Sequence, residues 1–460
     1  MEWKNAWTTY SETELTAVEG VAGRYRDYLS KGKTERECVS VAIELAEAKG
    51  YVDMKKVIAE GGKLVPGDRV YMDCMGKSLM LFIIGEAPLS KGFNILGAHV
   101  DSPRIDVKQN PLYEDGELAY LDTHYYGGIK KYQWVTIPLA LHGVVVKKDG
   151  SIVNVCIGED ENDPVFSISD LLIHLSREQM GKKASEVITG EQLDLIVGSM
   201  PLTEDEKSSA KANVLKILND MYGIEEEDFL SAELEIVPAG KARDLGFDRS
   251  LILGYGHDDR VCAYAQLEAM FDIEGVPAKT CACILADKEE IGSVGATGMR
   301  AKYFENAIAE LMELRGEYSE LNLRRGLAAC KMLSCDVSAG FDPAFPSAFE
   351  KKNTAFLGKG VCFNKFTGSG GKSGSNDANP EFVAELRKIM EDGSVTYQTA
   401  ELGRVDVGGG GTIAYICALY GMDVIDSGVA VLNMHAPWEI ISKADLYEAV
   451  KAYKVFVLNA

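Results

Sequence analysis

The sequence predicts an α/β protein: a layered α/β/α domain with a mainly parallel central sheet, interrupted by an inserted β-rich domain. Two observations predict this class. Strand-length apolar runs that end in polar loops alternate with amphipathic helical stretches, and residues 105–250 break that alternation. Strands buried on both faces and alternating with helices are typical of mainly parallel sheets. The 460-residue chain has room for roughly two or three domains with their own cores.

The strands and helices of the layered domain follow from their patterns. Four apolar runs predict buried strands that open into polar loops, at 93–102, 279–290, 328–340 and 423–439. Three stretches carry helical periodicity, at 259–273, 379–392 and 442–459. Ser442 begins the last stretch and is its expected N-cap.

The inserted domain is predicted from residues 134–158, which read as two strands joined by a turn at 147–151. Helices and an acidic linker at 223–229 follow. Insertions are tolerated where chain ends lie close together. We therefore expect one discontinuous domain, at 1–104 and 251–460, and one inserted domain at 105–250.

Charge and composition argue against several classes of function. The net charge of −22 repels phosphate backbones and anionic lipid, so we expect no nucleic-acid and no membrane partner. The polar start of the chain holds no apolar core of signal-peptide length, and no run reaches the length of a membrane span. The 10 cysteines lie mostly in apolar segments, which indicates reduced thiols of a cytoplasmic protein.

A set of histidines and acids lies at the polar ends of these apolar runs. Its members are His99, Asp101, Asp258, Glu289, Glu290, Asp336 and His435. Each alone has an ordinary explanation as a turn residue, a helix cap or a solvated charge. In open α/β sheets, however, ligands collect at the carboxyl ends of strands, so these side chains can converge. Two imidazoles and three carboxylates, with two further acids beside them, suit a pair of divalent ions.

One motif is a decoy. The stretch Gly-Gly-Lys-Ser at 370–373 suggests a phosphate-binding loop, but the template requires glycine where Phe366 stands. No apolar strand leads directly into the stretch, and no helix opens directly after Lys372. We therefore interpret 366–377 as a glycine-rich loop without that function.

The order of the motifs resembles one known family. GAH-x-DSP, an Asp at the start of a helix, D-x-EE-x-GS, CD-x-S and MH-x-x-x-E occur in the order found in the aspartyl aminopeptidase family, which includes vacuolar aminopeptidase I. The resemblance spans nearly the whole chain, including the insertion. It implies a metal-dependent aminopeptidase that hydrolyses the N-terminal residue of peptides. It also implies a β-rich dimerisation domain and a homo-oligomer, a dodecamer built from dimers.

The resemblance assigns the metal ligands. It gives His99 and Asp336 to one metal ion, and Glu290 and His435 to the other. Asp258 would bridge the two ions. Zinc is the expected metal, although cobalt and manganese also accept histidine and carboxylate ligands.

The resemblance also assigns the catalytic residues. Asp101 would orient His99, and Glu289 would be the general base for a water that bridges the two metals. A carboxylate beside such a water can take its proton and pass it to the leaving amine. Eukaryotic members usually have Leu-Asp-Asn where this chain has His257, Asp258 and Asp259, so Asp259 is the alternative bridging residue.

Substrate contacts are expected on a glycine-rich turn at 402–414. By resemblance, Gly409, Gly410 and Thr412 line the substrate cleft, and the glycines allow close approach of a peptide. His174 either packs within its own helix or enters the site of a neighbouring subunit.

An acidic side-chain pocket would need fixed positive charge in so acidic a chain. The candidates are Lys365, Lys372 and Arg404, which could equally be solvated surface charges. Trp438 stands where eukaryotic members carry a basic residue, so the acidic preference is one of two alternatives, the other being a neutral preference. A metal-dependent N-deacylase and a non-catalytic assembly protein are the remaining alternatives.

Overall fold

The computed structural model describes residues 3–203, 209–368 and 370–460, and it divides into two compact units. The first unit comprises Met1–Asp101, Ala242–Met434 and Glu439–Ala460, and the second comprises Ser102–Lys241 and His435–Trp438. Ser369, in the predicted loop at 366–377, and residues 1–2 at the polar start lie outside the described residues. The domain limits at 104/105 and 250/251 stay predictions.

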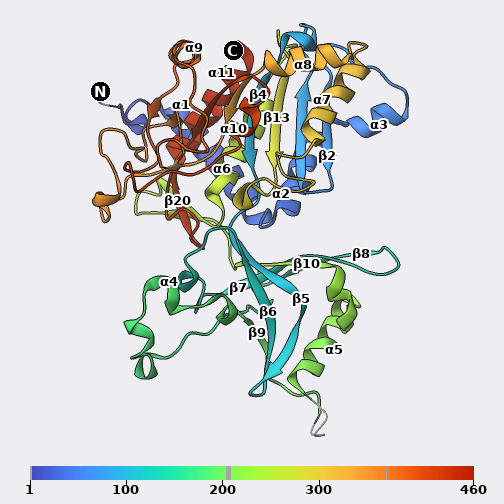
Figure 1. The fold of residues 1–460 in the computed structure, drawn as a ribbon, viewed down its shortest axis with the longest axis vertical. Coiled ribbons are helices and arrows are strands. Elements are labelled where there is room, and N and C mark those ends of the chain that lie inside the picture. Colours follow the sequence, from blue (N-terminus) through green and yellow to red (C-terminus); the bar gives the residue numbers. More distant parts are fainter. Residues whose placement is uncertain (1–2, 204–208, 369) are drawn as a thin grey trace. The chain divides into compact units, whose positions relative to one another are not determined.

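The first unit is built on a nine-stranded sheet in the order β1-β2-β3-β13-β4-β14-β18-β16-β17 (Figure 1). Its strands are β1 (Val52–Asp53), β2 (Arg69–Cys74), β3 (Ser78–Ile83), β4 (Asn94–His99), β13 (Cys281–Ala286), β14 (Lys331–Ser334), β16 (Val361–Asn364), β17 (Tyr397–Thr399) and β18 (Asp423–Gly428). The four central strands β13, β4, β14 and β18 run parallel, whereas β3 and β16 pair antiparallel to them. The predicted α/β class is confirmed.

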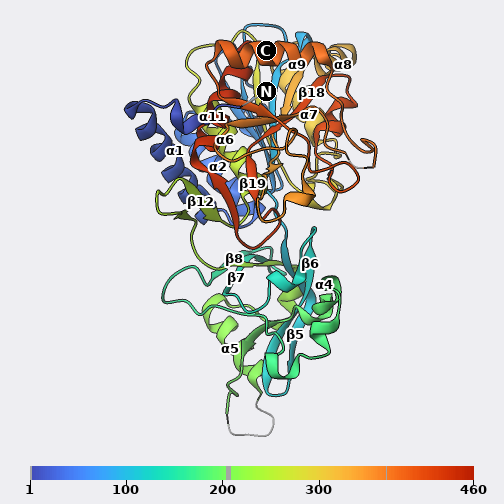
Figure 2. The ribbon, with the colours of Figure 1, turned by 90° about the vertical axis from the view of Figure 1, so that its left-hand side faces the viewer.

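Helices cover both faces of this sheet, which gives three layers. The helices of the first unit are α1 (Glu12–Lys31), α2 (Glu35–Ala48), α3 (Met54–Ala59), α6 (His257–Phe271), α7 (Tyr303–Leu314), α8 (Glu320–Ala328), α9 (Pro380–Asp392), α10 (Ala414–Ala418) and α11 (Lys443–Asn459). Helices α1, α2, α6 and α11 lie on one side and α7 and α8 on the other (Figures 1 and 2).

The side-chain alternation of the strands explains the layers. Along β13, Cys281, Cys283 and Leu285 pack into the core beneath α6 and α11, while Ala282 and Ile284 pack into the core beneath α7 and α8. Successive strand residues point to opposite faces, so an all-apolar strand must be covered twice.

The predicted helices are present with small changes at their ends. Helices α6, α9 and α11 occupy the three stretches that the periodicity indicated. Ser442 does stand at the N-cap of α11, but its side chain makes no capping hydrogen bond. A smaller five-stranded sheet completes the unit, with β11 (Arg243–Leu245), β12 (Leu251–Gly254), β20 (Glu439–Ser442), β19 (Ala430–Leu432) and β15 (Ser338–Ala339).

The second unit is a six-stranded antiparallel sheet in the order β8-β7-β10-β5-β6-β9. Its elements are β5 (Arg104–Asp115), β6 (Leu118–Tyr126), β7 (Leu139–Val146), β8 (Ile152–Ile157), β9 (Leu195–Gly198), β10 (Ala232–Pro238), α4 (Ala184–Val187) and α5 (Ala210–Tyr222). Strands β7 and β8 are the predicted hairpin, with its turn at 147–151. Part of the acidic linker forms the 3-10 helix Glu226–Ser231.

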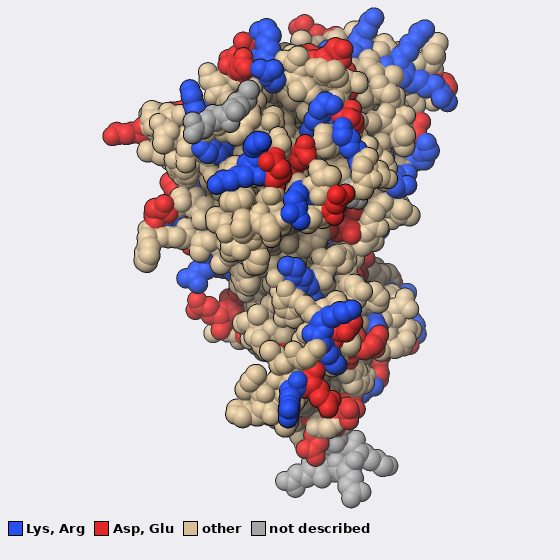
Figure 3. Space-filling model, turned by 60° about the vertical axis from the view of Figure 1, so that its left-hand side comes forward, with Lys and Arg blue, Asp and Glu red and all other residues tan. Residues whose placement is uncertain are grey.

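The charged side chains, the cysteines and the helices are distributed as follows. On the face in Figure 3, basic (blue) and acidic (red) side chains are interspersed. All 10 cysteines are free, and eight of them are buried. Within the described ranges, every helix is too short or too polar to cross a bilayer.

Candidate metal centre

Three adjacent parallel strands bring most of the predicted site residues to one edge of the central sheet. His99 is the last residue of β4, and Asp336 follows the end of β14 by two residues. Glu289 and Glu290 open the 3-10 helix η8 (Glu289–Ile291), three residues after β13. Because β13, β4 and β14 are neighbours, their carboxyl ends place these side chains together.

His99 is the buried centre of this group. Its side chain is 2% exposed, and its Nδ1 lies 3.0 Å from the carbonyl oxygen of Asp101 and 3.3 Å from Asp101 Oδ1. On the other side of the ring, Nε2 lies 3.3 Å from Asp258 Oδ1 and 4.0 Å from Glu289 Oε2. The Asp101 contacts are those that fix a ring so that Nε2 carries the lone pair.

Asp101 also holds the turn that carries the two glutamates. Its Oδ1 accepts a hydrogen bond from the backbone N–H of Glu289 at 3.1 Å, and its Oδ2 accepts one from Glu290 at 3.2 Å. One fully buried carboxylate therefore fixes both the imidazole and the start of η8.

Asp258 lies among the other candidate ligands. Its carboxylate, His99 and Asp336 offer ligand atoms that all lie within 4.8 Å of one another. Ligand atoms of Asp258 and Glu290 are likewise within 4.8 Å. The backbone N–H of Asp258 donates to Glu439 Oε2 at 2.9 Å, which fixes the start of α6.

The electrostatics of the group fit a cation. Burial alone would lower the pKa of His99, but the hydrogen bonds with Asp101 and Asp258 raise it well above its usual value. Burial and repulsion from Asp259 and Asp258 raise the pKa of Asp336. The acids close to the imidazole repel one another, so they favour protons bound to His99 and to Asp336. A divalent ion can replace those protons. Nitrogen and oxygen ligands at this spacing suit zinc.

Asp259 contacts the backbone at the end of β4. It is fully buried, and its Oδ2 accepts the backbone N–H of His99 at 3.3 Å. Burial and the repulsion from Asp258 raise its pKa well above the usual value, while His99 partly offsets the shift.

His435 belongs to the segment His435–Trp438, which groups with the second unit. Its Nδ1 lies 2.8 Å from the carbonyl oxygen of Gly128 in the same unit. A neutral ring that donates from Nδ1 carries its lone pair on Nε2. His435 remains a predicted ligand with the tautomer that ligation requires.

His174 does not lie in a regular α-helix. It is exposed in the 3-10 helix η4 (Ile173–Leu175) of the second unit. Its neighbours Leu172, Ile173 and Leu175 are 54%, 70% and 67% exposed. Such a run of exposed apolar side chains is typical of an interaction surface.

The predicted substrate residues lie in two loops of the first unit. Gly409, Gly410 and Thr412 are partly buried in the segment before α10, and Thr412 Oγ1 donates to Asp426 Oδ1 at 2.6 Å. Arg404 is exposed and makes no ion pair among the described residues.

The two candidate lysines share one acid. Lys365 and Lys372 both form ion pairs with Asp377, and Lys372 Nζ lies 3.9 Å from the centre of the Phe366 ring. One carboxylate thus offsets half of their combined positive charge. Arg404 is the candidate whose charge is not balanced in this way.

Comparisons with known proteins identify the family. The profile described as "Aminopeptidase I zinc metalloprotease (M18)" matches residues 28–457. A "Probable M18 family aminopeptidase 1" from Clostridium acetobutylicum is 61% identical over 459 residues, which cover 100% of this chain and 98% of that protein. The chain belongs to the M18 aminopeptidase family.

Solved structures of M18 proteins share the fold. A crystal structure of an M18 aminopeptidase from Thermotoga maritima superposes with a TM-score of 0.95 at 44% identity, covering 100% of both chains. The mApe1 dodecamer of S. cerevisiae, at 21% identity and a TM-score of 0.76, covers 95% of this chain and 96% of that one, and shows the fold alone. The predicted family and the prediction of a metallo-aminopeptidase are confirmed.

Two residues near the site escaped the sequence interpretation. Glu439 supports Asp258, and Asp426 supports Thr412. Glu439 is the last letter of the MH-x-x-x-E motif, which had no role assigned to it. Asp426 follows the apolar pair Val424 and Ile425 in β18, and an acid directly after buried apolar residues is the signal that could have revealed it.

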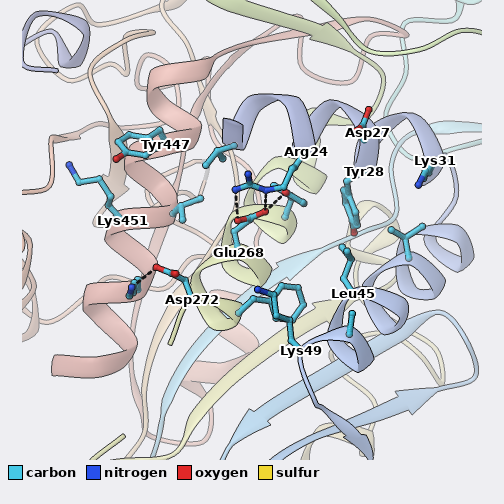
Figure 4. A pocket seen from close by; sticks show the side chains of 17 residues that line it. Arg24, Asp27, Tyr28, Lys31, Leu45, Lys49, Glu268, Asp272, Tyr447 and Lys451 are labelled. Carbon is cyan, nitrogen blue, oxygen red and sulfur yellow. Dashed lines mark hydrogen bonds and ion pairs between the residues drawn. The ribbon is translucent and has the colours of Figure 1, made fainter. Parts of the chain in front are cut away.

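A further cavity of the first unit lies away from the candidate metal centre. It measures about 770 Å³ between α1, α2, α6 and α11, and no predicted metal or catalytic residue lines it (Figure 4). Its basic residues are largely balanced: Arg24 pairs with Glu268, and Lys454 pairs with Asp272. No ligand class is indicated by this lining.

Proposed function

We propose that this M18 aminopeptidase uses two zinc ions and a glutamate base to remove the N-terminal residue of peptides. The observation that carries the proposal is the position of Asp258, whose carboxylate lies within 4.8 Å of ligand atoms of His99 and Asp336 and also of Glu290. A carboxylate between two such groups can bridge two ions. Asp259 is less suited, because it already accepts the N–H of His99.

The remaining ligands follow from the same arrangement. His99 and Asp336 would hold one ion, and Glu290 and His435 the other, with Asp258 between them. The support for His435 is chain connectivity: Met434 and Glu439 both belong to the first unit, and only four residues separate them. The bound ions would supply Lewis-acid polarisation of the scissile carbonyl and of the attacking water.

Glu289 would move the proton. Its carboxylate is 4.0 Å from His99 Nε2, and its side chain is 15% exposed, so it borders the ligand group without being buried in it. The Asp101 carboxylate fixes its backbone. Glu289 would take a proton from the attacking water and deliver it to the leaving amine.

We further propose an acidic substrate preference centred on Arg404. Lys365 and Lys372 contribute less because Asp377 neutralises part of their charge. A guanidinium can bind a substrate carboxylate through two parallel hydrogen bonds.

For the assembly we propose a dodecamer, supported by the fold shared with the mApe1 dodecamer and by the exposed apolar residues around His174. Its expected mass is about 600 kDa, twelve chains of 50.1 kDa each. A monomer mass by light scattering at micromolar concentration would refute the assembly. It would also remove any role for His174 in a neighbouring site.

A panel of aminoacyl reporters tests the function directly. The metal-free protein should be inactive, and Zn²⁺, Co²⁺ or Mn²⁺ should restore release of the N-terminal residue. N-acetylated reporters should not be cleaved, whereas a deacylase would prefer them. Full activity in a protein shown to be metal-free by elemental analysis would overturn the proposal.

A further inference from the structure

Three neighbouring parallel strands share a row of paired residues, and on two of these strands a candidate ligand follows two residues later. Ser334 on β14 pairs with Gly97 on β4 and with Asp426 on β18. Two residues further along their chains come His99 and Asp336. Asp426 is 2% exposed, so a buried carboxylate outside the candidate ligand set lies in this row of the sheet.

Asp426 binds the loop at 402–414 through Thr412. The Thr412 hydroxyl donates to Asp426 Oδ1 at 2.6 Å and accepts the backbone N–H of Ala414 at 3.3 Å. Both roles of the hydroxyl are used, which fixes its orientation. Burial raises the pKa of Asp426 to about 6, and the hydroxyls of Thr412 and Ser334 partly offset this. Above that pH the bond from Thr412 is charge-assisted and therefore stronger than a neutral one.

The next loop residue is held at the same level of the sheet. Ile413 is 2% exposed and packs over Gly97. A Cβ atom at Gly97 would lie 3.2 Å from Ile413 Cδ1 and 2.5 Å from Met332 Cε. The absent side chain of Gly97 thus makes room first for Met332 and also for Ile413, so two consecutive loop residues contact one row of the sheet.

The preceding glycines are bonded only through their backbone, and Gly408 donates its N–H to the carbonyl of Arg404. Gly409 has a φ of 121°, and Gly410 donates its N–H to the carbonyl of Thr367, itself in a loop. A glycine run loses much conformational entropy when it is ordered, so a fixed end limits the conformations available to it.

We propose that Asp426 is a positioning residue for substrate binding: through Thr412 it holds the 409–412 segment in the conformation that receives the peptide. This rests on the proposed function for that segment. Asp426 acts through Thr412 and touches neither substrate nor metal. Three observations carry the proposal. The Asp426 carboxylate is buried, the Thr412 hydroxyl both donates and accepts a hydrogen bond, and Ile413 packs where Gly97 has no side chain.

The test compares Thr412→Val, Thr412→Ser and Asp426→Asn with wild type, and uses Thr16→Val on the exposed face of α1 as the matched control. Thr412→Val preserves shape but removes the hydroxyl, and Thr412→Ser restores it. In Asp426→Asn the side-chain amide oxygen can still accept a weaker bond. Four quantities are measured: amide exchange of a peptide spanning 402–414, KM and kcat for an aminoacyl reporter, and metal content.

Thr412→Val should raise amide exchange of the loop and KM by roughly 10-fold or more, the effect of losing a hydrogen bond to a charged group. Metal content should not change, and kcat should change less than KM. Relative to Thr412→Val, Thr412→Ser should restore slow exchange of the loop and a lower KM, Asp426→Asn should be intermediate, and Thr16→Val should be silent.

Two results would overturn the proposal. Unchanged exchange in Thr412→Val would show that Asp426 does not hold the loop. Faster exchange with unchanged KM would show that the loop is held but does not position substrate. Exchange does not depend on turnover, so an inactive wild-type enzyme would refute the proposed function and leave the anchoring to be judged on exchange.

Discussion

The carboxylate of Asp101 lies 3.3 Å from Nδ1 of His99 and accepts the backbone N–H groups of both residues 289 and 290. One buried side chain therefore sets the imidazole of a predicted ligand and the turn that carries the predicted base. Displacement of Asp101 should disturb metal binding and proton transfer together. Mutation of Glu289 or of His435 should instead affect one of these two functions alone.

Glu289→Gln should keep the metal and lose most of the turnover. The amide removes the proton acceptor without removing a predicted ligand, and general acid–base assistance is worth ~10²–10⁴-fold. Steady-state kinetics and elemental analysis on the same preparation check this. Glu313→Gln, on the exposed face of α7, is the control and should be silent. A kcat near that of wild type in Glu289→Gln would move the base elsewhere, with Asp259 the first candidate.

His435→Ala should lower the metal content from roughly two ions per subunit to roughly one. The backbone φ at this position is 65°, in the left-handed region where histidine occurs more often than alanine, so Tm is measured beside the metal content to detect any loss of stability. His124→Ala changes an exposed histidine of the second unit and serves as the control. Unchanged stoichiometry in His435→Ala, with an unchanged Tm, would remove His435 from the ligand set.

The pH dependence of stability should reflect the titration of Asp445, which lies in α11 and is not one of the predicted ligands. Burial raises its pKa to about 8, although backbone N–H groups of Gly358 and Gly360 partly offset this. Between pH 4 and 8 the unfolded chain binds fewer protons at this site than the folded chain does. The free energy of unfolding therefore falls as pH rises through this window.

Asp445→Asn should remove that dependence. Relative to wild type, the variant should gain on the order of 2–4 kcal/mol in unfolding free energy between pH 5 and pH 8. Urea unfolding at fixed protein and metal concentration measures the difference. Asp406→Asn, at an exposed position, is the control. A constant difference between Asp445→Asn and wild type over this range would contradict the shift.

The sequence was most informative where one pattern had one physical cause. Apolar runs such as 279–290 predicted strands covered on both faces, and β13 contributes to two cores. The hairpin of β7 and β8 followed from its turn at 147–151. The convergence of His99 and Asp336 could be expected because parallel strands end at one edge, although their spacing in the chain says nothing about distance.

Contacts between distant segments were harder to foresee. The ion pairs of Lys365 and Lys372 with Asp377 depend on how a glycine-rich loop folds back, which no periodicity encodes. The grouping of residues 435–438 with the second unit has no local signal. The hydrogen bond between Thr412 and Asp426 joins residues that are 14 apart in the chain. It forms because the loop at 402–414 folds back onto the sheet, which the sequence pattern does not predict.

Substrate choice gives the last prediction. In a chain of net charge −22, a substrate carboxylate needs a fixed cation, and Arg404 is exposed without an ion-pair partner among the described residues. Reporters with N-terminal Asp or Glu should then be cleaved faster than Leu reporters. Arg404→Ala should raise KM for the Asp reporter by roughly 10-fold or more, since a bond between charged groups is lost, and should change KM for Leu by less than about twofold.

The lysines and a control complete this test. Lys365→Met should have a small effect, because Asp377 already balances part of its charge, and Asp377→Asn should favour acidic reporters by releasing that charge. Arg324→Ala on α8, where the arginine pairs with Glu320, should leave both reporters unchanged. If Leu proves the best reporter and Arg404→Ala, Lys365→Met and Lys372→Met are all silent, the acidic preference is wrong. The pocket would then select neutral side chains by shape, because no fixed cation would remain to attract a carboxylate against the charge of the chain.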